Sequence, residues 1–89
     1  MFPEVVNAVE TAKGEKWEQF AQRHGDWGRD LVLRVARECT GMTLRELGEA
    51  VGGMDYGAVS MAVRRIRLRM KRDRAIISAF NRTVHTLNI

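Results

Sequence analysis

The sequence predicts an all-α fold of five to six helices that form one domain over residues 1–89. Apolar residues recur at the three- and four-residue spacing of helices, whereas the strict alternation typical of strands is nearly absent. Polar residues suited to cap helices precede several of these segments. The one proline, Pro3, stands where the first turn of a helix tolerates it. A chain of this length buries a modest core that needs no disulfides.

Three helices are expected in the N-terminal half. The first covers residues 3–12 and ends before Gly14, and a short second helix covers residues 15–22. A polar loop leads to a third helix over residues 28–40, which Asp26 caps. The side chains expected to face the core are those of Val6, Val9, Trp17, Phe20, Leu31, Val32, Val35 and Cys39; Arg34 and Arg37 are expected on the opposite face of the third helix.

A capping box marks the start of the fourth expected helix, over residues 43–51. Thr43 and Glu46 each accept a hydrogen bond from an amide that the first turn leaves free. Gly52 and Gly53 end this helix, because glycine adopts backbone angles that other residues resist. Its residues expected to face the core are Leu44, Leu47 and Val51.

The fifth and sixth expected helices each begin at an aspartate cap. Asp55 opens a long helix that ends near Lys71, and Asp73 opens a final helix that ends near Leu87. The residues expected to face the core are Val59, Val63, Ile66 and Met70 in the long helix and Ile76, Phe80, Val84 and Leu87 in the final one. A second face of the long helix carries Ser60, Arg64, Arg67 and Lys71. The five methionines of the chain are interpreted as packing residues.

Positive charge is concentrated in the C-terminal part of the chain. The net charge is +4, with 15 Lys and Arg against 11 Asp and Glu, and 13 of these bases follow residue 22. Residues 64–74 hold seven bases and one acid. A basic, arginine-rich half of a small domain favours a polyanion partner such as nucleic acid.

Several protein classes are disfavoured by what the sequence lacks. No segment approaches the roughly 20 apolar residues of a membrane helix, and residues 1–4 lack the basic and apolar regions of a secretory signal. The single cysteine, Cys39, excludes an internal disulfide and is interpreted as a buried, inert thiol. A cytoplasmic protein is therefore expected.

No catalytic or cofactor-binding motif is found in the sequence. A Gly-rich phosphate loop is missing, and no Ser, His and Asp set or Cys and His set has a plausible spacing. His24 and His85 are isolated, so no metal site is expected. The chain is therefore predicted to be a binding protein rather than an enzyme, without a cofactor.

The helices expected around residues 43–51 and 55–71 form the pattern of a helix-turn-helix over about residues 43–72. In this motif the first helix braces the second, whose N-terminal turn enters the major groove of double-stranded DNA. The spacing from Gly48 to Val59 makes this turn about one residue longer than in the commonest form.

The same segment resembles a known family. Residues 51–60, VGGMDYGAVS, are similar to the Phe-Gly-Gly-Arg-Asp-His turn of the C-terminal DNA-binding domain of the bacterial replication initiator DnaA. Residues 37–48, RECTGMTLRELG, resemble the family's preceding helix, turn and helix opening, and the likeness covers about residues 4–88. The same domain occurs as a C-terminal extension of some transposases associated with repetitive palindromic elements. The resemblance implies a Trp-repressor-like helix-turn-helix, a nucleoid-associated protein, and a role in replication initiation or transposition.

The resemblance also implies roles for the start of the recognition helix. Asp55 is retained and, besides capping the helix, accepts a hydrogen bond from a cytosine amino group. Tyr56 stands in place of the family's histidine, and Gly57 and Ala58 stand in place of two threonines. Ala58 contacts a thymine methyl group, and Gly57 lets a DNA strand approach closely. Because Met54 replaces a family arginine, we expect duplex DNA binding at a site other than the initiator's usual box.

Further DNA contacts are implied outside that turn. The family reaches the minor groove with a basic loop before its third helix, and here the loop is shorter and carries only Arg23 and His24. Arg29 matches an arginine at the start of the family's third helix, and Arg45 is placed to meet a phosphate at a helix N-terminus. The remaining candidate contacts along the recognition helix are Ser60, Arg64 and Arg65.

Two other functions remain open at this point. The basic helix also suits a protein-interaction module that docks an acidic partner. RNA binding is a third possibility, which exposed aromatic residues would favour, but the six aromatic residues stand mostly at core positions. A salt titration separates the first two, because counterion release weakens DNA binding steeply as salt increases.

Overall fold

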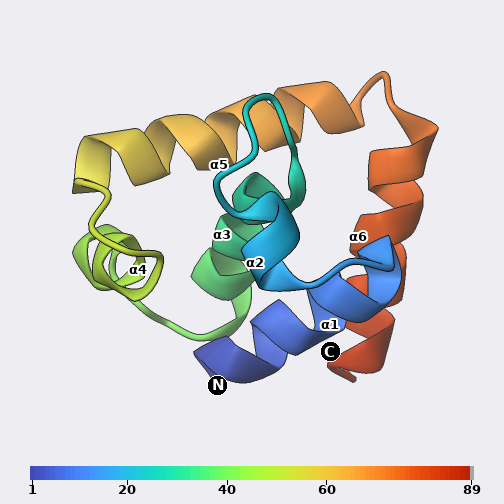
Figure 1. Cartoon of the computed structure of the whole chain (residues 1–89), viewed down its shortest axis with the longest axis horizontal. Helices are drawn as coiled ribbons and strands as arrows, with labels where there is room; N and C mark the ends of the chain where they lie inside the picture. Colours follow the sequence, from blue (N-terminus) through green and yellow to red (C-terminus); the bar gives the residue numbers. More distant parts are fainter. Residues whose placement is uncertain (89) are drawn as a thin grey trace.

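Helix α3 (Gly28–Cys39) lies at the centre of the fold in a computed structural model that describes residues 1–88 (Figure 1). Five of its apolar residues are fully buried and belong to one core cluster shared with the other helices. These residues are Leu31, Val32, Leu33, Val35 and Ala36. Residues 1–88 contain no β-strand, so the predicted all-α fold is confirmed.

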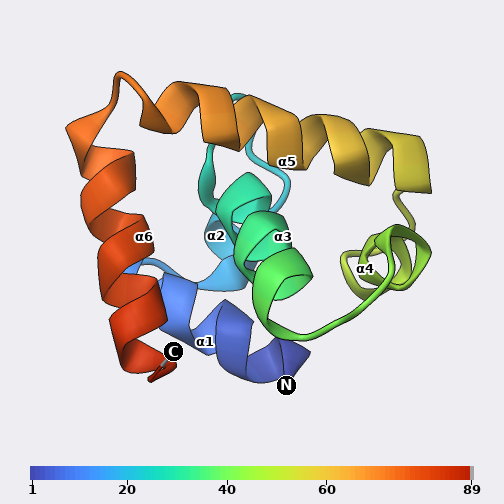
Figure 2. The ribbon, with the colours of Figure 1, turned by 180° about the vertical axis from the view of Figure 1, so that it is seen from behind.

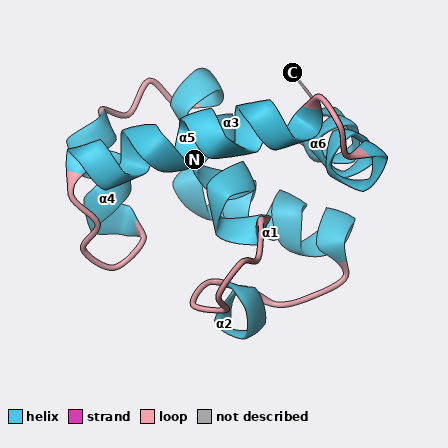
Figure 3. Ribbon diagram, turned by 90° about the horizontal axis from the view of Figure 1, so that it is seen from above, coloured by secondary structure: helices cyan, strands magenta, loops and turns pink. Residues whose placement is uncertain are grey.

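Five other helices surround α3. They are α1 (Phe2–Lys13), α2 (Trp17–Phe20), α4 (Leu44–Ala50), α5 (Tyr56–Met70) and α6 (Arg74–Thr86). The longest, α5, runs across one side of the molecule, with α4 below its N-terminal end and α6 below its C-terminal end (Figure 2). Figure 3 shows α4 and α6 at the two ends of α5 from above. Within the described range, no helix has the length and apolar character needed to cross a membrane.

The predicted caps at Thr43, Asp55 and Asp73 are all formed. Thr43 Oγ1 accepts from the Glu46 N–H at 3.1 Å, and Glu46 Oε1 accepts from the Thr43 N–H at 2.9 Å. The hydrogen bond from the Thr43 backbone lowers the pKa of Glu46. Asp55 Oδ1 accepts from the Ala58 N–H at 2.8 Å, and the Asp73 carboxylate caps α6 in the same way. Each cap satisfies an amide that the first turn cannot satisfy itself.

The turn between α4 and α5 is tight, and three glycines make it possible. Gly52 and Gly53 have φ angles of 99° and 102°, which other residues rarely adopt. The carbonyl of Gly48 accepts hydrogen bonds from the N–H groups of Gly53 and Met54 at 2.9 and 3.0 Å. A Cβ atom at Gly48 would lie 1.9 Å from the Met54 carbonyl oxygen, so only glycine fits there. The turn thereby holds the start of α5 against α4.

The predicted inward residues of α1 do contact the core, but the fully buried face is wider than predicted. Val9 is buried as expected, but Val5 and Ala8 are the other buried residues, and Val6 is only half-buried. The reason is that α1 packs against both α3 and α6, so its buried face is centred between these two neighbours.

Helix α2 is one turn long rather than the predicted eight residues. Lys16 is extended, and the Trp17 N–H donates to the Glu10 carboxylate at 2.8 Å, which fixes the start of the helix at Trp17. Phe20 is buried and Trp17 is half-buried against the core, as predicted. Their rings pack edge to face, with centroids 5.6 Å apart.

The ends of α3 differ slightly from the prediction. The Asp26 carboxylate accepts from the Gly28 N–H at 2.7 Å, so Asp26 does help to cap α3. It does so from one position further out, because the N-cap residue is Trp27. At the other end Cys39 is half-buried rather than buried, and its partial burial raises the pKa of the thiol.

Arg34 does not lie on an outer face of α3 as predicted. Its guanidinium group stacks 4.7 Å from the centroid of the Phe80 ring, and Nη1 donates to Met70 Sδ at 2.8 Å. Arg34 therefore joins α3 to α5 and α6, because both helices cover that side of α3. On α6 the fully buried side chains are Ile76, Ala79 and Thr83, while Phe80 and Val84 on this helix and Leu87 at its C-cap are half-buried.

Candidate nucleic-acid interface

The start of α5 forms the first part of the candidate interface. Tyr56 is 62% exposed, and Gly57 and Ser60 are exposed beside it. Ala58 is half-buried, and its N–H is occupied by the capping bond to Asp55. These five predicted contact residues therefore share the N-terminal end of one helix and its cap.

A shallow hollow of about 360 Å³ adjoins this surface on the α4 side. Arg45 and Tyr56 line it from two different helices, and its other lining residues are Arg37, Thr43 and Leu44. The Arg37 guanidinium donates to the Met42 carbonyl at 2.9 Å. Arg45 is exposed and forms no ion pair within residues 1–88, so its charge faces solvent.

A second hollow lies between the middle of α5 and the loop that leads into α3. Its volume is about 480 Å³. The ionisable side chains that line it are those of Arg23, His24, Asp26, Arg29, Asp30, Arg65 and Arg69. The predicted contacts Arg23, Arg29 and Arg65 thus come together here, about 14 Å along α5 from Tyr56. The structure therefore divides most of the predicted site residues into two groups.

Arg65 is held by a buried carboxylate that sequence analysis missed. Its Nε and Nη2 atoms donate to the two Asp30 oxygens at 2.8 and 3.0 Å, and the Asp30 side chain is only 5% exposed. The hydrogen bonds to Asp30 raise the pKa of Arg65. Further along the same flank, Arg69 donates to the Gly25 carbonyl at 3.5 Å. Because 35 residues separate Asp30 from Arg65, no local spacing reveals this pair.

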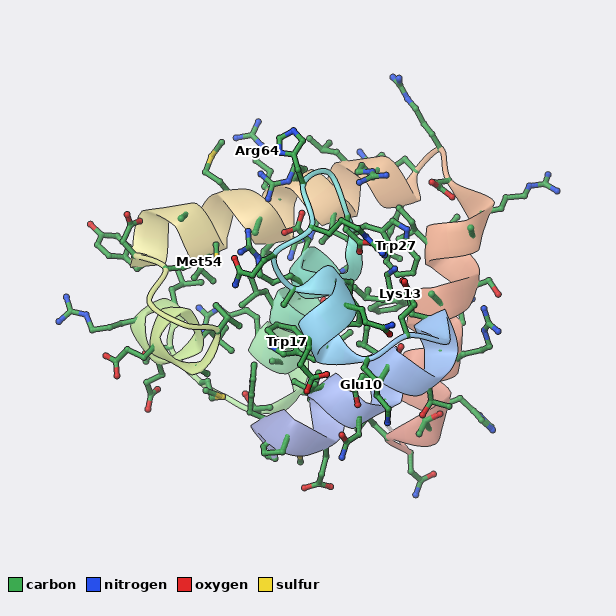
Figure 4. The ribbon with its side chains drawn as sticks, viewed as in Figure 1. Glu10, Lys13, Trp17, Trp27, Met54 and Arg64 are labelled. Carbon is green, nitrogen blue, oxygen red and sulfur yellow. The ribbon has the colours of Figure 1, made fainter. Side chains whose placement is uncertain are left out.

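Arg23 belongs to a charged cluster that was also missed. Its Nη2 donates to Glu15 Oε1 at 2.7 Å and also to the Asp26 carboxylate. Lys13 donates to the same two carboxylates, with its Nζ 3.0 Å from Asp26 Oδ2. The nearly buried Lys13 ammonium lies 4.9 Å from the centroid of the Trp27 ring, and Figure 4 shows these two side chains together. A cation over an indole face is stabilised by the ring's negative face.

The ion pairs of this cluster perturb its titration. The hydrogen bond from Arg23, followed by that from Lys13, lowers the pKa of Glu15 to about 2. Burial raises the pKa of Asp26, but hydrogen bonds from Arg23, the Gly28 N–H and Lys13 outweigh burial and hold it below its ordinary value. The Glu15 carboxylate in turn raises the pKa of Arg23. Arg23 is thus tied to the loop by two carboxylates.

The outer side of α5 has a different character. Arg64 and Arg67 are exposed, and no carboxylate of the described residues pairs with either. Figure 4 places Arg64 on the side of α5 that faces away from the rest of the molecule. These two guanidinium groups are therefore free to bind a ligand.

Two large apolar side chains also lie on α5 in solvent. Met61 is 61% exposed and Leu68 is 51% exposed. The interpretation of every methionine as a packing residue is therefore wrong for Met61, and also for the exposed Met1. Helical spacing could have shown this, because Met61 lies two residues from both Val59 and Val63, on the opposite side of the helix.

The chain matches no protein-family model, no curated protein and no solved structure. No group of three or more His, Cys, Asp or Glu side chains suited to a metal ion occurs in the part of the chain that the structure describes. The surface of α5 and its surroundings is therefore the basis for a functional proposal.

Proposed function

We propose that this protein binds double-stranded DNA, with α5 as the recognition helix in the major groove. The observation that carries this proposal is the outward face of α5, where an exposed first turn is followed by the unpaired Arg64 and Arg67. Guanidinium groups on such a face suit both phosphate oxygens and the O6 and N7 acceptors of guanine.

The proposed motif is a helix-turn-helix made by α4, the glycine turn and α5. Packing of α4 on α5, with Gly48 against Met54, supports a fixed docking angle for α5. The likeness of residues 51–60 to the DnaA motif favours the Trp-repressor-like variant. A role in replication initiation or in transposition, within the bacterial nucleoid and cytoplasm, is part of the same proposal.

The two groups of predicted contacts take different roles in this proposal. Arg45 meets a backbone phosphate in the hollow beside α4, while Tyr56 and the rest of the first turn of α5 meet base edges. Arg29 meets a phosphate or a base edge of the DNA from the loop side. Arg23 and Arg65 contribute less, because carboxylates already neutralise them.

A salt titration tests the proposal. The affinity for a fluorescent random-sequence duplex is measured by anisotropy between about 50 and 200 mM salt, where counterion release predicts a linear fall of log affinity with log salt. Arg64→Ala should reduce that slope by about one unit. The control is Arg82→Ala, which removes the same charge from an exposed position on α6. Absence of duplex binding at low salt overturns the proposal.

Selection from a random duplex pool tests whether α5 reads a sequence. Tyr56→Ala and Arg29→Ala should lower the preference for the selected site more than Lys71→Ala, which lies at the far end of α5. If all three variants lose the same amount of general, salt-dependent affinity and keep their sequence preference, Tyr56 is not a base-reading residue. Tight and selective binding to the initiator's usual box would contradict the expectation of a different site.

A protein-interaction module is the second candidate function. The observation that favours it is the exposure of Met61 and Leu68 on a basic helix, since apolar side chains flanked by cations suit an acidic partner. Failure to bind any duplex at low salt would favour this candidate.

A further inference from the structure

The N-terminal half of α5 exposes apolar and aromatic groups where a reading helix commonly carries amide or guanidinium groups. Tyr56 is 62% exposed and Met61 is 61% exposed, and no core residue covers either side chain. Met61 lies one turn after Gly57 and one turn before Arg65, so it sits within the half of α5 that enters the groove in the proposed docking.

Hydrogen-bonding side chains are scarce in the part of α5 that precedes Arg64. One Asp55 oxygen already accepts from the Ala58 N–H, and neither Gly57 nor Ala58 has a polar side chain. The hydroxyl groups of Tyr56 and Ser60 are the polar groups that follow the cap in the first five residues of α5. A surface of this composition reads shape and apolar contacts better than donor and acceptor patterns.

Gly57 leaves this surface open, although the fold does not require glycine there. Its φ angle is not positive, and a Cβ atom would come near only the Asp55 carboxylate, at 3.3 Å. Glycine disfavours helix by up to about 1 kcal/mol relative to alanine. In return, glycine at this position lets a ligand approach the helix backbone closely beside Met61.

In the major groove, thymine alone among the four bases presents a methyl group. We propose that α5 selects its DNA site through thymine C5-methyl groups, with Met61 as the side chain that contacts them. This inference rests on the proposed DNA binding and names what that surface reads. Gly57 and Met61 are about 6 Å apart along the helix axis, which is less than two base-pair rises. The open surface from Gly57 to Met61 therefore spans about two base-pair steps.

Replacing thymine by deoxyuridine tests the inference directly, because this change removes the methyl group and keeps the hydrogen-bonding pattern. The probe is the duplex selected from the random pool, made once with thymine and once with deoxyuridine. We expect about fourfold weaker binding for each contacted methyl group, measured by anisotropy at one fixed salt concentration.

A pair of matched variants assigns the effect to one side chain. Met61→Ala should bind the thymine duplex about as weakly as the wild type binds the deoxyuridine duplex, and should not discriminate between the two. Leu68→Ala removes a similarly exposed apolar side chain two turns further along α5 and should keep the discrimination. Both changes are at exposed helix positions, and circular dichroism verifies the helix content.

The outcomes separate this inference from the proposed function. Equal and tight binding of both duplexes by the wild type, or a selected site without thymine, overturns methyl reading and leaves DNA binding in place. Retained discrimination in Met61→Ala overturns the assignment to Met61. Absence of binding to either duplex overturns the proposed function itself.

Discussion

The two flanks of α5 carry arginines in very different settings. On the inner flank, Arg65 is bound by the buried Asp30 carboxylate and Arg69 reaches a loop carbonyl. On the outer side, Arg64 and Arg67 have no carboxylate partner in the described range. Neighbouring arginines therefore have different roles. Those of the inner flank tie α5 to α3 and its preceding loop, whereas those of the outer side are open to a ligand.

The partners of these arginines change how the positive charge of the chain is interpreted. Residues 64–74 contain seven bases, but the structure engages some of them with its own acceptors. A guanidinium group that is already paired with a carboxylate neutralises DNA phosphates less well, so fewer counterions leave the DNA when the protein binds. The expected salt dependence is therefore set by the unpaired arginines rather than by net charge.

The largest expected effect comes from Gly48→Ala, which would disturb the support of α5 rather than either flank. Its Cβ would lie 1.9 Å from the Met54 carbonyl oxygen, which is backbone and cannot move without moving the turn. We expect the free energy of unfolding to fall by about 3 kcal/mol, the upper end of the usual cost of overpacking. Denaturant unfolding followed by circular dichroism measures it.

Glu49→Ala is the control for that variant, because Glu49 is the next residue in α4 and is exposed. Its unfolding free energy should stay within about 0.5 kcal/mol of the wild type. Equal stability of Gly48→Ala and the wild type would show that the turn is not held by this contact.

The next effect compares Arg65 with Arg64. Arg65→Ala should lower the free energy of unfolding by about 2 kcal/mol, because the buried Asp30 carboxylate loses two donors. Arg64→Ala should change stability by less than about 0.5 kcal/mol and weaken duplex binding instead. Chemical denaturation and anisotropy on the same two proteins measure both quantities. If Arg65→Ala is as stable as Arg64→Ala, the distinction between the flanks fails.

The smallest effect concerns the stability in acid of the charged cluster formed by Lys13, Glu15, Arg23 and Asp26. The pKa of Glu15 is lowered from 4.5 to about 2, so its stabilising contribution is complete above pH 4.5 and is lost as the pH falls toward 2. Thermal unfolding midpoints recorded across this range should fall less steeply for Glu15→Gln than for the wild type. Asp26, whose pKa is also lowered, retains part of the acid sensitivity in the variant.

Glu18→Gln serves as the control for the acid series, because Glu18 is exposed and forms no ion pair among residues 1–88. Its unfolding midpoints should follow those of the wild type at every pH. An acid profile unchanged by Glu15→Gln would mean that the cluster does not contribute to folding stability.

Features determined by neighbouring residues were predictable from the sequence. The Thr43 and Glu46 capping box, the Asp55 cap and the glycine turn depend on residues within about one helical turn, and all are formed. The buried residues Val59, Val63 and Ile66 of α5 follow from helical periodicity alone.

Features determined by distant residues were not predictable. The pairing of Asp30 with Arg65, and that of Lys13 with Asp26, join segments 35 and 13 residues apart. Which residues of α1 are fully buried depends on where α6 lies, so the burial of Val5 and Ala8 was not predicted. Within the candidate site, the exposed start of α5 was predictable from the helical pattern. The ion pairs that hold Arg23 and Arg65 were not, because their partners are brought close only by the tertiary structure.

The placement of Tyr56 also provides a spectroscopic probe. It is the only tyrosine of the chain, and it stands at the exposed beginning of α5 beside Arg45. Growth on 3-fluorotyrosine would therefore introduce fluorine at a single position, and the protein would show one ¹⁹F resonance. A ligand seated on the start of α5 would shift that resonance, whereas one bound only at the distant face of α6 would leave it unchanged.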